Sequence, residues 1–83
     1  MTVLYFAWVR QRLGTGEEQI ELPPEIGTVR ELAEHLQSRG GAFADVFSEP
    51  KRLRAAINQE HAAWDASLQT ATEVAFFPPV TGG

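Results

Sequence analysis

The last six residues, Pro78-Pro79-Val80-Thr81-Gly82-Gly83, form the segment of this sequence best suited to chemistry. No charged side chain follows Glu73, so the α-carboxylate of Gly83 is the only charge in the segment and is ionised at neutral pH. Two glycines lack a Cβ and fit a channel too narrow for other residues. The diproline and the two β-branched residues after it favour an extended stalk. A partner could activate such a carboxylate as an acyl-adenylate and convert it to a thiocarboxylate.

The residues before this segment must hold it in place, and the first of them predict a strand. Residues 2–9 are rich in aromatic and β-branched side chains and should form a strand with two apolar faces. An alternating strand puts Val3, Tyr5, Ala7 and Val9 on one face and Leu4, Phe6 and Trp8 on the other. Because both faces are apolar, we expect this strand to be central in a sheet. The glycines of residues 14–16 predict a hairpin turn after it.

The clearest helix is predicted over residues 28–39. Thr28 and Glu31 have the spacing of a capping box, and Gly40-Gly41 should end the helix. Its apolar residues fall on one stripe, which predicts one face packed on a sheet. Further strands are expected at 19–22, 53–57, 61–63 and 72–77, with a short helical turn near Phe43 and Phe47 and a tight turn at Asn58-Gln59. This order predicts an α+β fold in which a mixed sheet of four or five strands packs on one main helix.

Composition limits the classes of function. The 83 residues are enough for one small domain, and the net charge of −4 disfavours nucleic-acid binding. The absence of cysteine excludes disulfides and thiolate metal sites, and it favours a cytoplasmic protein. We expect no metal at His35 and His61, which are far apart in sequence, and no membrane-spanning segment.

Three stretches of the sequence carry a resemblance to a known family. Residues 73–83, Glu-Val-Ala-Phe-Phe-Pro-Pro-Val-Thr-Gly-Gly, resemble the C-terminal signature of the small subunit of molybdopterin synthase. Residues 3–15 are similar to the start of that family, and residues 55–59 to its internal strand and turn. One stretch departs from the family. Where the family has an acidic, glycine-containing turn before the last strand, residues 68–72 contain no glycine.

The resemblance implies a ubiquitin-like β-grasp domain over residues 1–77 and a flexible functional tail over 78–83. It implies a sulfur carrier for molybdenum cofactor biosynthesis, with no bound cofactor. An E1-like enzyme would adenylate Gly83 with ATP, and a sulfur donor protein would complete the thiocarboxylate. The tail, with Gly82 and Gly83 at its tip, would then deliver sulfur to the cyclic pyranopterin monophosphate precursor inside the large subunit. The family assembly is a heterotetramer in which this chain acts as a co-substrate, and it would not be catalytic alone.

The partner interface implied by the resemblance and by the apolar pattern lies near the tail. In the family the position of Phe77 packs into the large subunit, and the stalk of Pro78, Pro79, Val80 and Thr81 follows it. Phe6 and Trp8 form a second candidate contact, unless Phe43, Phe47 or Trp64 folds over them. Arg10 is the basic residue expected to contact the activating enzyme.

Three other functions stay open at this point. A thiamine-pathway sulfur carrier has a similar fold and Gly-Gly end but typically lacks the Phe-Phe-Pro-Pro stalk. A ubiquitin-like protein modifier would share the activation of Gly83 and differ in its acceptor. A plain interaction module would tolerate the loss of Gly83.

Overall fold

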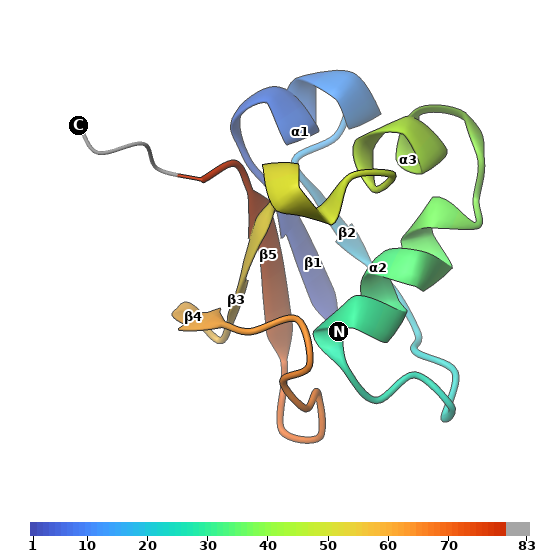
Figure 1. Ribbon diagram of the computed structural model, residues 1–83. Helices are drawn as coiled ribbons and strands as arrows, with labels where there is room; N and C mark the ends of the chain where they lie inside the picture. Colours follow the sequence, from blue (N-terminus) through green and yellow to red (C-terminus); the bar gives the residue numbers. More distant parts are fainter. Residues whose placement is uncertain (80–83) are drawn as a thin grey trace.

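Five strands form one mixed sheet in the computed structural model, which describes residues 1–79 (Figure 1). The strands stand in the order β2-β1-β5-β3-β4. The central pair β1 and β5 is parallel, and the other neighbours are antiparallel. The mixed five-stranded sheet predicted from the sequence is therefore confirmed. The strands are β1 Thr2–Tyr5, β2 Glu17–Gln19, β3 Arg54–Ile57, β4 Glu60–Ala62 and β5 Glu73–Phe77.

The main helix, α2 (Val29–Gln37), forms where the sequence predicted it and lies over one face of the sheet (Figure 1). The capping box is present, because the Thr28 hydroxyl accepts from the Glu31 N–H at 3.2 Å and the Glu31 carboxylate accepts from the Thr28 N–H at 3.1 Å. After the helix, Gly40 has a positive φ of 79°, which turns the chain into α3 (Gly41–Val46). A 3₁₀ turn, η1 (Pro50–Arg52), follows.

The first strand is shorter than predicted, and the expectation of a strand through Val9 is wrong. The chain leaves the sheet at Phe6, turns at Ala7 with a positive φ of 54°, and forms helix α1 (Ala7–Leu13). Val9 is buried as predicted, but it is buried because α1 packs against the core. A short run of alternating apolar residues fits a strand or a buried helix, and packing of α1 on α3 and β5 decides between them.

The glycines after this helix have a different role from the predicted hairpin turn. Gly14 ends α1 in the left-handed conformation, with φ 77°, and its N–H donates to the Arg10 carbonyl. Strands β1 and β2 still pair in the antiparallel sense, but α1 lies between them in sequence. Strand β2 spans Glu17–Gln19, so the strand predicted over 19–22 is correct only at Gln19. Glu17 pairs with Leu4, and residues 20–22 lie outside the strand.

The turn before β5, which the absence of glycine placed in doubt, is held by Asn58. The Asn58 side-chain oxygen accepts from the N–H of Thr72 at 3.0 Å and of Glu73 at 3.1 Å, and its amide donates to the Thr70 carbonyl. Asn58 and Gln59 have φ of 50° and 72°, which confirms the predicted tight turn between β3 and β4. No residue from 68 to 72 has a positive φ, so the turn does not need a glycine.

The core lies between the helices and one face of the sheet. It contains the buried faces of β1, β5 and β3 together with residues of all three helices: Val3, Tyr5, Val9, Val29, Leu32, Ala33, Leu36, Val46, Phe47, Leu53, Ala55, Leu68, Val74 and Phe76. The Tyr5 hydroxyl donates to the Glu18 carboxylate at 2.6 Å, and Arg39 pairs with the same carboxylate at 2.7 Å. Burial, together with the Glu18 contact, raises the pKa of the Tyr5 hydroxyl far above its ordinary value.

Neither a membrane span nor a metal cluster is found in the part of the chain that the structure describes. Its helices are too short and too polar to cross a bilayer. Its His, Asp and Glu side chains do not gather in groups of three that would hold a metal ion.

Candidate functional site

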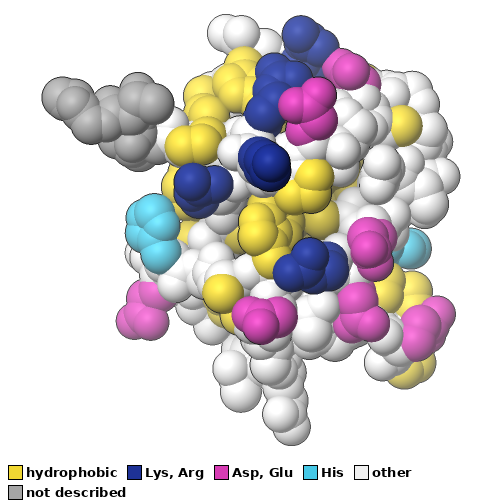
Figure 2. Space-filling view, in the orientation of Figure 1, with side chains coloured by type: hydrophobic (Ala, Val, Ile, Leu, Met, Phe, Trp, Pro, Cys, Tyr) yellow, Lys and Arg dark blue, Asp and Glu magenta, His cyan; other side chains and the backbone are white. Residues whose placement is uncertain are grey.

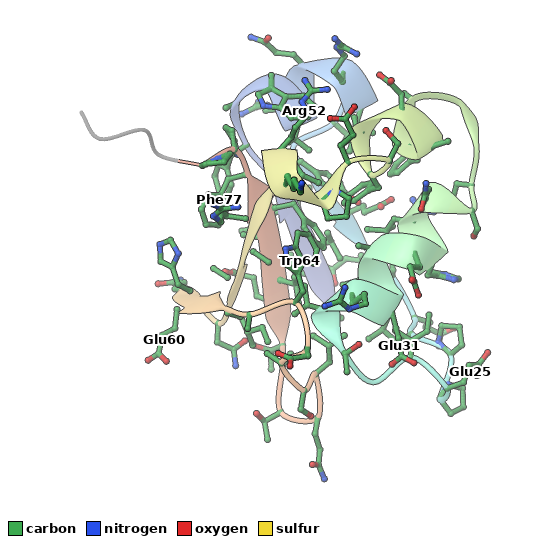
Figure 3. All side chains as sticks on the ribbon, viewed as in Figure 1. Glu25, Glu31, Arg52, Glu60, Trp64 and Phe77 are labelled. Carbon is green, nitrogen blue, oxygen red and sulfur yellow. The ribbon has the colours of Figure 1, made fainter. Side chains whose placement is uncertain are left out.

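The sheet face away from the helices is apolar, and no helix or strand within residues 1–79 covers it. Strand alternation and the β1–β5–β3 register put Leu4, Ala75 and Ala56 on this face, and Phe77 follows at the end of β5. Figure 3 shows Phe77 on the side away from α2, with Trp64 on the helix side of the sheet. We call this surface the open face and define it by Leu4, Phe6, Ala56, His61, Ala75 and Phe77, which line one shallow hollow together with Gln59 and Glu73.

The hollow has a small-residue floor and an aromatic rim. Ala56 and Ala75 are only 8% and 7% exposed, yet neither belongs to the core cluster, because larger neighbours on the open face shield them. Phe6 is 48% exposed, the largest exposure of any bulky apolar side chain in residues 1–79. The His61 ring packs edge-on against Phe77 with ring centroids 5.4 Å apart. Such a depression can receive a protruding apolar side chain from a partner.

The alternative in which aromatic residues fold over the open face is wrong. Phe43 packs edge-on against Tyr5, with centroids 6.2 Å apart, on the helix side. Phe47 and Trp64 both pack on Phe76, at 5.0 and 6.3 Å. These three rings therefore complete the core and leave Phe6 exposed.

Trp8 does not lie beside Phe6 as the strand prediction required. It is a half-buried residue of α1, and its ring lies under the Arg52 guanidinium, 4.6 Å from the ring centroid. The structure thus separates the predicted pair, with Phe6 on the open face and Trp8 between α1 and η1. The role of either residue in binding a partner stays a prediction.

Arg10 is exposed on α1, close to the end of the sheet where β5 finishes. Its side chain lies against Gly16, where an added Cβ would be 3.0 Å from the Arg10 Nε. Gly16 therefore allows this close approach, which a larger residue would disturb.

The stalk begins at the edge of the open face. Phe76 is fully buried and Phe77 half-buried, as the alternation of β5 predicted. Pro78 and Pro79 then leave the sheet on the side away from α2 and α3 (Figure 1). Val80, Thr81, Gly82 and Gly83 lie outside the described residues, so their predicted roles are not tested by the structure. The predicted division between a domain and a functional tail at residue 77 also stays a prediction.

Sequence reasoning missed Ala56, Ala75 and His61 as part of this surface. Alanine is a weak signal, because it suits both a core and a surface. The register that puts Ala56 opposite Ala75, and His61 opposite Ala56, is a property of the folded sheet. Strand alternation could have placed Ala75 beside Phe77, but it could not have placed β3 next to them.

Comparison with known sequences gives a consistent result over the whole chain. The model of the ThiS family matches residues 3–83. The molybdopterin synthase sulfur carrier subunit of Escherichia coli is 41% identical over 81 residues, covering 98% of this chain and 96% of that protein. The protein of the same name from Haemophilus influenzae is 36% identical over 83 residues, covering 100% and 99%. The human one is 32% identical over 84 residues, covering 98% and 91%.

Solved structures agree with the fold. A Pyrococcus furiosus protein assigned as molybdopterin converting factor subunit 1 superposes with a TM-score of 0.74 at 34% identity, covering 95% of each chain. SAMP1 from Haloferax volcanii superposes with a TM-score of 0.73 at 23% identity, covering 99% of this chain and 97% of that one, and supports the fold alone. The predicted ubiquitin-like β-grasp fold is confirmed.

Proposed function

We propose that this chain, which belongs to the ThiS family, is the sulfur carrier subunit of a molybdopterin synthase. The observation that carries the proposal is similarity over nearly the full length to three molybdopterin synthase sulfur carrier subunits, at 41%, 36% and 32% identity. The resemblance found in the sequence is thereby confirmed. The uncovered apolar face next to the stalk agrees with a chain that works against partner proteins.

In this proposal the chemistry belongs to the Gly83 carboxylate, as the family resemblance implies. A carboxylate oxygen attacks the α-phosphate of ATP, and pyrophosphate leaves. Hydrosulfide released by a donor then attacks the carbonyl carbon of the acyl-adenylate, the bond from that carbon to the AMP oxygen breaks, and AMP leaves as the thiocarboxylate forms. The thiocarboxylate is a strong nucleophile: its sulfur attacks a carbon of the pyranopterin precursor, and water then cleaves the resulting thioester, which leaves the sulfur on the precursor and restores the Gly83 carboxylate. Two such transfers complete the dithiolene.

Three partners follow from this sequence of steps: a large synthase subunit, an E1-like adenylating enzyme and a sulfur donor protein. The open face supports the first of them. Phe6 and Phe77 offer aromatic anchors around a floor of alanines, an arrangement that suits a hot spot filled by an apolar side chain. The chain binds no cofactor itself in this proposal, and ATP is consumed by the activating enzyme. The cytoplasmic location stays a prediction.

The decisive experiment is the intact mass of the chain after incubation with ATP, a sulfur source and the E1-like enzyme of the same cell. Replacement of one oxygen by sulfur is expected, about 16 Da heavier by the atomic masses. The mass before incubation also shows whether Gly83 carries the free carboxylate in the mature protein. Deletion of Gly83 should abolish the shift, while Glu25→Gln, at an exposed site on the opposite side of the molecule from Phe77 (Figure 3), should leave it unchanged. An unmodified wild-type chain beside an enzyme that is active on another carrier would contradict the proposal.

The alternatives differ in the acceptor of the activated group. Thiocarboxylated chain mixed with the large subunit and the precursor should yield molybdopterin. Transfer to protein lysines without molybdopterin would instead favour a modifier, and transfer only in the presence of thiazole-forming enzymes would favour a thiamine-pathway carrier.

A further inference from the structure

Four cationic side chains gather at the end of the sheet where the stalk leaves. We name them the basic collar and define it as Arg10, Lys51, Arg52 and Arg54. All four are exposed. The chain as a whole has a charge of −4, so this local excess of positive charge is opposite in sign to the molecule.

The fold, and not the sequence, brings the collar together. Arg54 pairs with Phe77 in the β3–β5 ladder and so lies beside the last residue of β5. The turn η1 holds Lys51 and Arg52 immediately before β3, the strand that begins at Arg54. The Arg52 guanidinium lies over Trp8, which joins η1 to α1.

Arg10 completes the collar from the other side of α1. It packs on Gly16, whose carbonyl accepts from the Tyr5 N–H at the end of β1. Because β1 and β5 are parallel, the end of β1 and the start of the stalk are at the same end of the sheet.

No carboxylate among the described residues neutralises the collar. Within residues 1–79, the ion pairs are Arg12 with Asp45 and Arg39 with Glu18, and neither includes a collar residue. Glu17 and Glu49 also lie at this end, but neither forms an ion pair with the collar. Arg52 lies over the Trp8 ring and Arg54 donates to the Leu53 carbonyl, but neither contact neutralises a cation, so within residues 1–79 the four exposed charges of the collar have no carboxylate partner.

Most carboxylates lie away from the collar. Figure 2 shows Lys and Arg concentrated over the half of the molecule that carries α1 and η1, and most Asp and Glu over the other half. Figure 3 labels Arg52 and Glu25 at opposite ends of the molecule. A molecule polarised in this way approaches an acidic surface with its stalk end first.

We infer that the basic collar docks on an acidic protein surface at the entrance to the adenylating active site and draws the stalk towards it. This inference rests on the proposed function. An activating enzyme must release each carrier after modification, so its turnover benefits more from fast association than from tight binding. Such attraction raises the association rate and adds little to the residence time. The collar orients the chain before it docks, and the apolar open face contacts the partner once the chain has docked.

The test measures the association rate of the chain with its E1-like enzyme, without ATP, at low and at high salt. Lys51→Glu and Arg54→Glu should each lower the rate about threefold to tenfold at low ionic strength, and the double variant more. All rates should converge near 0.5 M salt, where the screening length is short. Arg30→Glu is the matched control, because Arg30 is exposed on α2, forms no ion pair within residues 1–79 and changes the net charge equally. Its rate should stay within about 1.5-fold of wild type, and thermal melting of each variant verifies the fold.

Several outcomes would overturn the inference. Equal losses in Lys51→Glu and Arg30→Glu would mean that only net charge counts. A loss that persists at high salt would point to a short-range contact, and a raised KM for ATP with an unchanged association rate would place the collar on the nucleotide. Failure of the sulfur chemistry is scored separately by the intact mass, since association is measured without ATP. A salt-independent association rate would therefore contradict the inference about the collar without contradicting the proposed function.

Discussion

The two faces of the sheet are both apolar, but one packs in the core and the other is open. The helix-side face contributes Val3, Tyr5, Val74 and Phe76 to the core, all at most 1% exposed. The open face carries Leu4, Phe6 and Phe77, which no element in the described chain covers. Apolar sequence alone therefore does not distinguish residues that stabilise the fold from residues available to a partner. The difference lies in whether a helix has been placed over them.

Phe76 and Phe77 are neighbours on opposite faces of the sheet, so substituting each of them tests most directly whether the two faces differ in role. Phe76→Ala should lower the free energy of unfolding by about 3–5 kcal/mol, since Phe76 is fully buried and packs against Phe47 and Trp64. Urea unfolding followed by circular dichroism measures the change. A loss below about 1 kcal/mol would mean that the helix-side face is not the stabilising one.

Phe77→Ala should have the converse effect. We expect binding to the large subunit to weaken by about 2 kcal/mol, or roughly 30-fold, as for an aromatic hot spot, with a stability loss well below that of Phe76→Ala. Calorimetric titration provides the affinity. Phe43→Ala is the matched control, since Phe43 is half-buried on the helix side and should affect stability and not binding. Equal binding by Phe77→Ala and wild type would remove Phe77 from the interface.

Asn58 tests whether the turn that anchors β5 can be weakened without altering the open face. Asn58→Ala removes the acceptor for the Thr72 and Glu73 N–H groups and places alanine at a positive φ, so the free energy of unfolding should fall by about 1–2 kcal/mol. Asn58→Gly keeps the backbone geometry and should lose less. Denaturant melts give both values, and affinity for the large subunit should stay within about twofold. A variant that binds poorly while remaining folded would show that this turn and the open face are coupled.

Tyr5 predicts an effect confined to high pH, a pH dependence specific to the covered face. The folded-state pKa of Tyr5 is raised above its unfolded value near 10, so the neutral form is favoured in the fold. Its contribution to stability is fully present below pH 10 and is lost as the pH rises, by about 1.4 kcal/mol per pH unit. Unfolding measured between pH 9 and about 11.5 should show this slope in the wild type, and Tyr5→Phe should lack it. The same slope in both proteins would assign it to other groups.

The sequence predicted best where the signal was local. The capping box of Thr28 and Glu31 and the apolar stripe of α2 predicted the main helix, and the tight turn at Asn58-Gln59 was also predicted. Prediction failed at residues 7–9, where alternating apolar residues favoured a strand and the chain instead begins helix α1. Their packing on α3 and β5 made them a helix, and the two apolar patterns cannot be told apart over so short a run. The open face was anticipated only through Leu4, Phe6 and Phe77, because its alanines carry no signal.

The sequence by itself determined the helix α2 and the alternation of β5, since both depend on neighbours in the chain. Only the tertiary structure decided which apolar face stays open and which cations meet at the base of the stalk. The physical reason is that both depend on strand order: β1 lies beside β5, and β3 brings Arg54 to Phe77. Pairing between segments distant in sequence reflects the packing of the whole chain, and no local pattern encodes it.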